Sequence, residues 1–197
     1  HIMGDVQRIF YFHVASAWVS YLAFGITFLG GLVYLKTKNT GWDHLAYASA
    51  EIGVVFCTLA ILTGPLWGKA VWGVFWKWED LKLFMTLVLW LVFIAYLALR
   101  ANVDSGSQRA NLSAVFGVIG FICIPLSLAA NRIWTQFHPT VVATSKGSLQ
   151  SAMVVGLVSA VFALTFLYIY FLLARLEVLR MRESIEEIKQ AVGDMDG

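Results

Sequence analysis

The chain of 197 residues is 59% hydrophobic and 15% aromatic, and only 13% of its residues are charged. With a mean hydropathy of +0.75 it has too little polar surface to cover a soluble globule, so an all-α integral membrane protein surrounded by lipid is expected. The formal net charge of +2 comes without a basic arm or stripe, which excludes nucleic acid as an expected partner.

Five apolar runs are long enough to cross a bilayer, which takes roughly 20 apolar residues at about 1.5 Å per residue. They cover residues 14–35, 45–66, 81–100, 110–130 and 148–174. These runs predict a single transmembrane domain, residues 1–175, built as a bundle of about five helices.

Three features stand out within these apolar runs, taken in chain order. Glu51 is the only ionisable residue well inside a run, and such a residue is either functional or hydrogen-bonded within the bundle; both interpretations stay open. Gly64 and Pro65 predict the point where the second span gives way to a loop. Pro125 predicts a kink in the fourth span and a freed carbonyl about one turn earlier.

The charged segment 176–197 follows the last span, with Leu176, Leu179 and Ile185 or Ile188 on one side of a helix. We expect this helix to continue the span into the cytoplasm as a C-terminal tail.

Because five successive spans alternate in direction, each connection between them can be assigned to one face of the membrane. The N-terminal end, the tryptophan-rich segment 67–80 and the loop 131–147 share one face of the membrane. The polar turns 36–43 and 100–109 share the other face with the C-terminal tail. Lysine and arginine count eight on this second face and six on the first, so the positive-inside rule puts the second face in the cytoplasm and the first outside.

Half of the eight tryptophans lie in the segment 67–80, between the second and third spans. The candidate ligand-binding residues of this segment are Trp67, Gly68, Trp72, Gly73, Trp76, Trp78, Glu79 and Asp80. Four large flat side chains at one water–lipid boundary form a broad aromatic platform, and glycine beside a ring lets a ligand or backbone come close. An aromatic belt is the simpler interpretation of any one tryptophan, but it does not explain their close spacing.

His13 and His138 fall on the same face as the tryptophan segment, whereas His44 falls on the other. Neutral imidazole is a common axial ligand of haem iron, so the two histidines are candidate metal ligands for a haem at the membrane surface. A lone interfacial histidine is more often only a solvated side chain, and the argument depends on the coincidence of two. Cys57 and Cys123 are read as core residues, and without a Cys-x-x-Cys-His motif the haem would be non-covalent haem b.

At this point the residues match a known pattern. The run Trp67-Gly-Lys-Ala-Val-Trp-Gly-Val-Phe-Trp-Lys-Trp-Glu79 resembles the tryptophan-rich WWD signature of haem-handling proteins. The run Arg8-Ile-Phe-Tyr-Phe-His13-Val resembles the segment that carries the first outer histidine of the CcmC family, and His138 falls where that family carries its second. The resemblance extends from about residue 8 to the end of the last span.

The resemblance implies a membrane subunit of cytochrome c maturation system I, located in the inner (cytoplasmic) membrane. Such a protein holds haem at the outer face with the tryptophan segment and the two histidines, and passes it to the periplasmic haem chaperone CcmE. It associates with the CcmA and CcmB transporter components and the small subunit CcmD. No catalytic turnover by the chain alone is expected, and whether it assists covalent attachment of haem to the chaperone is left open.

The chain departs from the family pattern in three respects. Family members usually have six spans; their signature usually ends in aspartate, where this chain has Glu79 followed by Asp80; and Phe75 stands where tryptophan is common. The longer CcsA proteins of system II share the signature and are the nearer alternative. A small transporter or channel subunit, with Glu51 and the Pro125 kink lining a polar path, is the alternative from a different functional class.

Overall fold

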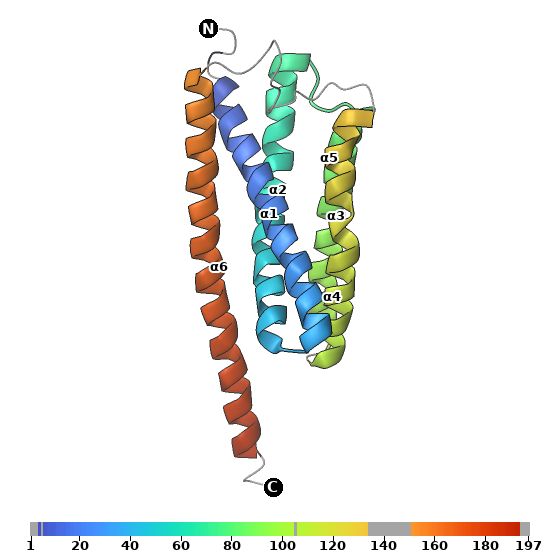
Figure 1. Ribbon diagram of the computed structural model, residues 1–197, viewed down its shortest axis with the longest axis vertical. Helices are drawn as coiled ribbons and strands as arrows, with labels where there is room; N and C mark the ends of the chain where they lie inside the picture. The colour runs from blue at the N-terminus through green and yellow to red at the C-terminus, as the bar shows by residue number, and fades with distance from the viewer. Residues whose placement is uncertain (1–3, 5, 105, 134–150, 194–197) are drawn as a thin grey trace.

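The computed structural model describes residues 4, 6–104, 106–133 and 151–193, and every regular element within them is a helix (Figure 1). The helices are α1 (Val6–Thr37), α2 (Thr40–Trp72), α3 (Leu81–Asn102), α4 (Ser107–Phe121), α5 (Cys123–Ile133) and α6 (Ser151–Gly193). Five stretches are long and apolar enough to cross a membrane: α1, α2, α3, α6 and Ser107–Ala129, which joins α4 to most of α5. The expected all-α multi-pass membrane protein is confirmed.

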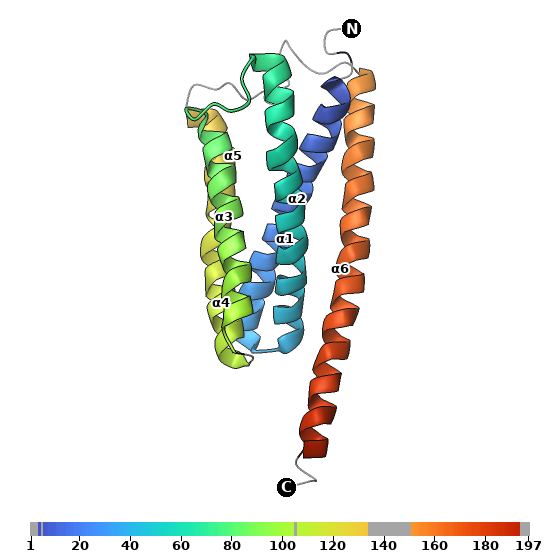
Figure 2. The ribbon, with the colours of Figure 1, turned by 180° about the vertical axis from the view of Figure 1, so that it is seen from behind.

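The helices run alternately up and down, so the tryptophan segment between α2 and α3 lies at the same end as the start of α1 (Figure 1, Figure 2). The turn between α1 and α2 lies at the opposite end and is much shorter than the expected polar turn. It consists of Lys38, whose φ is +58°, and Asn39, whose side chain caps α2 by accepting from the Gly41 amide at 2.9 Å. The remaining polar residues of this region belong to the helices.

The pair α1 and α2 forms the centre of the bundle. Gly53 lets the two helices approach closely, because a Cβ there would lie 2.7 Å from the ring of Phe24 on α1. Ser49 of α2 donates to the Ala23 carbonyl of α1 at 2.7 Å and lies 2.7 Å from the Tyr168 hydroxyl of α6. These hydrogen bonds give the two hydroxyl groups partners that the surrounding lipid could not offer.

Other helices cover the two sides of this pair. On one side α6 contributes Tyr168, Leu172 and Leu179 to a core shared with α1 and α2. On the other side Leu89, Phe93 and Tyr96 of α3 form a second core with residues of α1 and α2, among them the fully buried Cys57. Reading Cys57 as a core residue is therefore confirmed.

The fourth span is interrupted where Pro125 predicts a kink. Helix α4 ends at Phe121, α5 begins at Cys123, and the Ile122 amide bonds the Ile119 carbonyl with the tighter i−3 spacing at 3.1 Å. Proline has no amide hydrogen to give the carbonyl four residues earlier, which is that of Phe121, and its ring crowds that carbonyl. The break falls about one turn before the proline, where the prediction puts the freed carbonyl.

The second span does not end at Gly64 and Pro65, so that expectation was wrong. Helix α2 continues for two more turns to Trp72, and Gly73, in the left-handed region with φ 76°, ends it by donating its amide to the Lys69 carbonyl at 3.1 Å. A proline inside a membrane helix costs one backbone bond, and packing against neighbouring helices compensates for this loss. The first part of the tryptophan segment is therefore helical.

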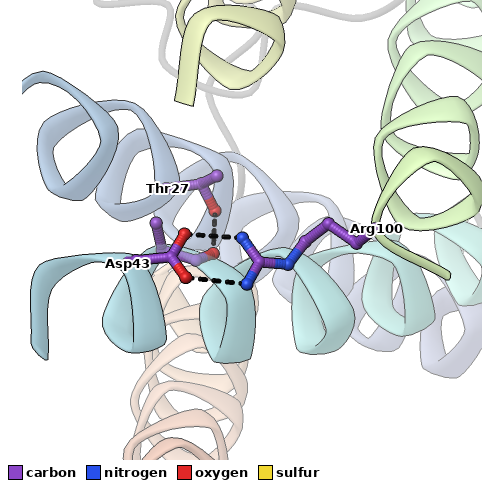
Figure 3. A network of polar contacts seen from close by, with 4 residues as sticks. Thr27, Asp43 and Arg100 are labelled. Atoms are coloured by element: carbon purple, nitrogen blue, oxygen red, sulfur yellow. Dashed lines mark hydrogen bonds and ion pairs between the residues drawn. The ribbon is translucent and has the colours of Figure 1, made fainter. Parts of the chain in front are cut away.

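Two ion pairs hold the opposite end of the bundle together. Arg100 of α3 donates two hydrogen bonds to Asp43 of α2 at 2.6 and 2.8 Å, and Thr27 of α1 lies beside them (Figure 3). Arg175 of α6 makes the same forked contact with Glu51 of α2, again at 2.6 and 2.8 Å. Of the two interpretations left open for Glu51, hydrogen bonding within the bundle is the one the structure shows.

Candidate functional site

The tryptophan segment consists of the end of α2, a connection and the start of α3. Trp67 and Trp72 belong to α2, and Trp76 and Trp78 belong to the connection before α3 begins at Leu81. Gly73 makes the turn possible, because its left-handed backbone conformation favours a residue without a Cβ. Lys69 reinforces the turn by donating to the Gly73 carbonyl at 2.9 Å.

The four tryptophan rings form two tilted pairs instead of one flat surface. The ring centres of Trp67 and Trp72 are 5.4 Å apart with an interplanar angle of 85°, and those of Trp76 and Trp78 are 5.7 Å apart at 59°. Exposure differs sharply along the segment, from 6% at Trp67 to 68% at Trp78. Trp67 therefore supports the segment from beneath, while Trp78 is accessible from outside.

Two buried indole nitrogens lack a partner among the residues that the structure describes. They are Nε1 of Trp67 and Nε1 of Trp76, one from each pair of rings. A buried donor left unsatisfied costs about 1–3 kcal/mol, so native proteins rarely tolerate one without a reason. Both N–H groups could donate to an acceptor brought by a ligand.

Lysine side chains lie over the aromatic rings of the same segment. Nζ of Lys69 is 5.3 Å from the centre of the Phe75 ring, and Nζ of Lys77 is 5.4 Å from the centre of the Trp72 ring. Cation–π contacts of this kind keep positive charge close to the aromatic surface. The segment thus combines apolar ring faces with cations and N–H donors, a chemistry suited to a flat apolar molecule that bears carboxylates.

His13 lies in the second turn of α1 and contacts α2. Its Nδ1 is 3.0 Å from the Ala60 carbonyl and 3.2 Å from the Thr63 hydroxyl, and its Cε1 would be 3.0 Å from a Cβ added at Gly64. A carbonyl can only accept, so Nδ1 must carry the proton and donate it. In the neutral ring Nε2 then carries the lone pair, which is the tautomer that a metal ligand needs.

Phe10 connects the histidine to the tryptophan segment. It lies three residues before His13 on α1, is 6% exposed, and its ring centre is 6.2 Å from that of Trp67. Since three residues of helix rise about 4.5 Å, His13 lies one turn deeper in the bundle than this ring contact. The structure therefore brings His13 and the tryptophan segment to the same end of the bundle.

Two other histidines, His44 and His138, were considered with His13 as possible ligands. His138 lies outside the described residues. His44 belongs to α2 at the opposite end of the bundle, where its Nδ1 is 3.7 Å from a carboxylate oxygen of Glu183 on α6. His44 therefore takes no part in the candidate site.

The acidic end of the segment has a structural role. Asp80 is 4% exposed and its Oδ1 accepts from the amides of Lys82 and Leu83, at 3.0 and 3.2 Å, as the N-cap of α3. Glu79 is exposed. Asp80 therefore fixes the point where the tryptophan segment ends and α3 begins.

Sequence reasoning missed the residues that support His13. The sequence indicates only that Ala60, Thr63 and Gly64 lie near the end of an apolar span and that Phe10 lies three residues before His13. A signal was present: Phe10 and His13, three residues apart, share a helix face, and Gly64 and Trp67 share a face of α2 in the same way.

Comparison with known proteins identifies the family of the chain. The family model described as "CcmC: Heme exporter protein C" matches residues 1–191. Heme exporter protein C of Bradyrhizobium diazoefficiens is 33% identical over 192 residues, covering 95% of this chain and 73% of the relative.

More distant relatives agree with this result. A putative cytochrome c biosynthesis ccmC-like mitochondrial protein of Marchantia polymorpha is 30% identical, covering 92% of this chain and 75% of the relative. Heme exporter protein C of Escherichia coli (strain K12) is 31% identical, covering 68% of this chain and 55% of the relative. With its fold of membrane-spanning helices and a family match over nearly its whole length, the chain belongs to the CcmC, or heme exporter protein C, family of cytochrome c biogenesis.

Proposed function

We propose that this protein binds haem b non-covalently at the outer face of the membrane and presents it to the haem chaperone CcmE. The observation that carries the proposal is the anchored imidazole of His13. Its Nδ1–H is given to the Ala60 carbonyl, which sets the ring orientation and leaves Nε2 as the coordinating nitrogen. This anchored ring lies about one turn below the tryptophan segment, at the same end of the bundle.

The tryptophan segment fits the other parts of a haem molecule. Ring faces of Trp72, Trp76 and Trp78 offer apolar contact to the macrocycle, and the exposed Trp78 keeps one side accessible. The buried N–H groups of Trp67 and Trp76, and the ammonium groups of Lys69 and Lys77 over the neighbouring rings of Phe75 and Trp72, match the two carboxylates that haem carries. Iron, macrocycle and carboxylates would each have a partner of suitable chemistry.

His138 is our proposed second axial ligand, because alternation of the five spans puts its loop at the end that carries His13. A cargo that must be handed over has to remain reachable. A site at the end of a helix bundle permits this, whereas a haem buried between helices would be closed off.

The proposed setting is the inner membrane, with the tryptophan segment facing the periplasm and the C-terminal helix in the cytoplasm, in line with the lysine and arginine count. CcmA, CcmB and CcmD are the proposed partners besides CcmE. The name heme exporter protein C, shared by the family and its bacterial relatives, supports haem handling in preference to catalysis. Glu51 gives no support to a transporter path, since its carboxylate is bonded to Arg175.

A handover assay tests the proposal. The detergent-solubilised protein, loaded with haem and freed of excess, is mixed with the soluble domain of CcmE, and the two are separated before their Soret absorption is measured. We expect haem to move to the chaperone from the unmodified protein and from the His44→Ala control, and the His13→Ala variant to bind haem more weakly and to deliver much less of it. Haem that stays with the membrane protein, or transfers equally from the His13→Ala variant, would contradict the proposal.

A further inference from the structure

Helix α6 extends well beyond the rest of the bundle. Figures 1 and 2 show its C-terminal part continuing past the turn between α1 and α2. Leu179 is its last buried residue, and from Arg180 to Gly193 every residue except the partly covered Glu183 is exposed. Apart from His44 of α2, whose Nδ1 lies 3.7 Å from a Glu183 carboxylate oxygen, the described part of the chain leaves this extension exposed.

The extension carries an apolar stripe with a spacing of alternately three and four residues. We call this the heptad stripe: Val178, Met181, Ile185, Ile188 and Val192, with exposures of 36%, 51%, 51%, 63% and 47%. Apolar residues repeating every 3.5 residues on average are the pattern of a two-stranded or higher coiled coil. In heptad notation the first, third and fifth of these residues, all β-branched, occupy position a, and the other two occupy position d.

The heptad stripe faces away from the bundle. Leu172, Leu176 and Leu179, which pack against α1 and α2, lie on the other side of α6. Met181 follows Leu179 by two residues, which is about 200° around a helix. A second helix can therefore cover the stripe without displacing anything from the bundle.

Lipid does not account for this stripe. Charged side chains surround it on the extension, and five of them lie within one stretch of eight residues: Arg180, Arg182, Glu183, Glu186 and Glu187. Placing such a stretch in the hydrocarbon layer would be costly, so the extension stands in water. An exposed apolar stripe in water marks an interaction surface.

We propose that the heptad stripe pairs with the same stripe of a second copy of this chain, as a parallel two-stranded coiled coil. Two copies inserted in the membrane in the same orientation have their α6 helices parallel by necessity. The charges beside the stripe suit this direction. Glu177 at position g faces Arg182 at position e of the other copy, and Ser184 at g faces Lys189 at e, so no like charges meet. An antiparallel pair would instead bring the cations at e together.

Confinement of both copies to one membrane favours this pairing. A coiled coil of about two heptads is marginal for free peptides in water, because the ordering of short helices is costly. Two copies confined to one bilayer meet at a much higher effective concentration than free peptides. The dimer is therefore expected in a bilayer and weakened by dilution into detergent.

Cysteine cross-linking of the full chain in liposomes tests the proposal. With Cys57 and Cys123 replaced by alanine, Ile188→Cys puts a thiol on the stripe and Glu186→Cys puts a matched thiol off it. Under mild oxidation we expect the stripe variant to form a disulfide-linked species of twice the chain mass, at least tenfold faster than the Glu186→Cys control. Adding Ile185→Asp should remove this difference.

Equal rates for the two thiols, or a fast reaction that survives Ile185→Asp, would overturn the pairing. Cross-linking in native membranes to a different chain alone would overturn the choice of a second copy as occupant. Photobleaching of labelled, otherwise unmodified protein in liposomes checks the result without cysteine changes, and one-step bleaching throughout would also overturn the proposal.

Discussion

Replacing Gly64 with alanine should weaken haem binding with little change in the stability of the fold. The added Cβ would lie 3.0 Å from Cε1 of the His13 ring, below the 3.4 Å at which ordinary contact begins, so the ring must move by a few tenths of an ångström. That movement strains the 3.0 Å bond from Nδ1 to the Ala60 carbonyl. Loss of a hydrogen bond that orients a metal-ligating histidine costs about 10–100-fold in affinity, and we expect about tenfold, or about 1.4 kcal/mol.

The stability change should be small. Alanine is favoured over glycine inside a helix by about 1 kcal/mol, which offsets the strain at His13, so the unfolding temperature of Gly64→Ala should stay close to that of the unmodified protein. Haem titration followed at the Soret band gives the affinity, and thermal unfolding in detergent gives the stability. Gly25→Ala is the matched control, because its added Cβ would lie 3.8 Å from the Phe121 ring, an ordinary contact. Unchanged haem affinity in Gly64→Ala, with the protein folded, would refute the role assigned to His13.

Three further outcomes are expected. Arg100→Ala leaves the Asp43 carboxylate buried without its cation, which should cost about 3–5 kcal/mol in the free energy of unfolding in detergent; a change below about 1 kcal/mol would contradict the role of that pair. Asp80→Ala should cost about 1 kcal/mol by removing the cap of α3, whereas Asp80→Asn keeps an accepting oxygen and should cost little, and equal losses in thermal unfolding would argue against capping. Trp76→Phe removes one N–H donor and keeps most of the ring, so haem should dissociate several-fold faster, by about 1 kcal/mol, in a stopped-flow transfer assay to apomyoglobin; an unchanged rate would exclude that donor.

Much of the fold could be predicted because membrane spans depend on run length and composition. The Pro125 interruption was predictable for a similar reason, since the lost bond belongs to proline itself and to the carbonyl four residues earlier. The same rule failed at Pro65, where α2 continues to Trp72. Whether a helix continues through a proline depends on neighbouring helices that supply packing and bonds, and local sequence does not report them.

The ion pairs between helices could not be predicted from the sequence. Asp43 and Arg100 are 57 residues apart, and both were assigned to polar turns. Their pairing requires the helix faces to be known. One local signal existed: Asp43, Tyr47 and Glu51 recur at four-residue spacing and so share a face of α2.

The sequence was enough to predict which residue types make up the candidate site and at which end of the bundle they lie. Clustered tryptophans and a nearby His13 could be read directly from the sequence. The sequence could not show which tryptophan ring is buried, because the 6% exposure of Trp67 depends on Phe10 from another helix. The bond from His13 to Ala60 could not be predicted either, since every residue has a backbone carbonyl and the residue type does not show which one accepts.

Electron paramagnetic resonance of the ferric haem complex tests the central claim most directly, because low-spin and high-spin signals distinguish six-coordinate bis-histidine iron from iron that has lost a strong axial ligand. The unmodified protein and the His44→Ala control should both give a low-spin bis-histidine signal. His13→Ala and His138→Ala should each shift the signal toward high spin, and added imidazole should restore it. A signal unchanged by His13→Ala in a folded, haem-loaded protein would contradict the account.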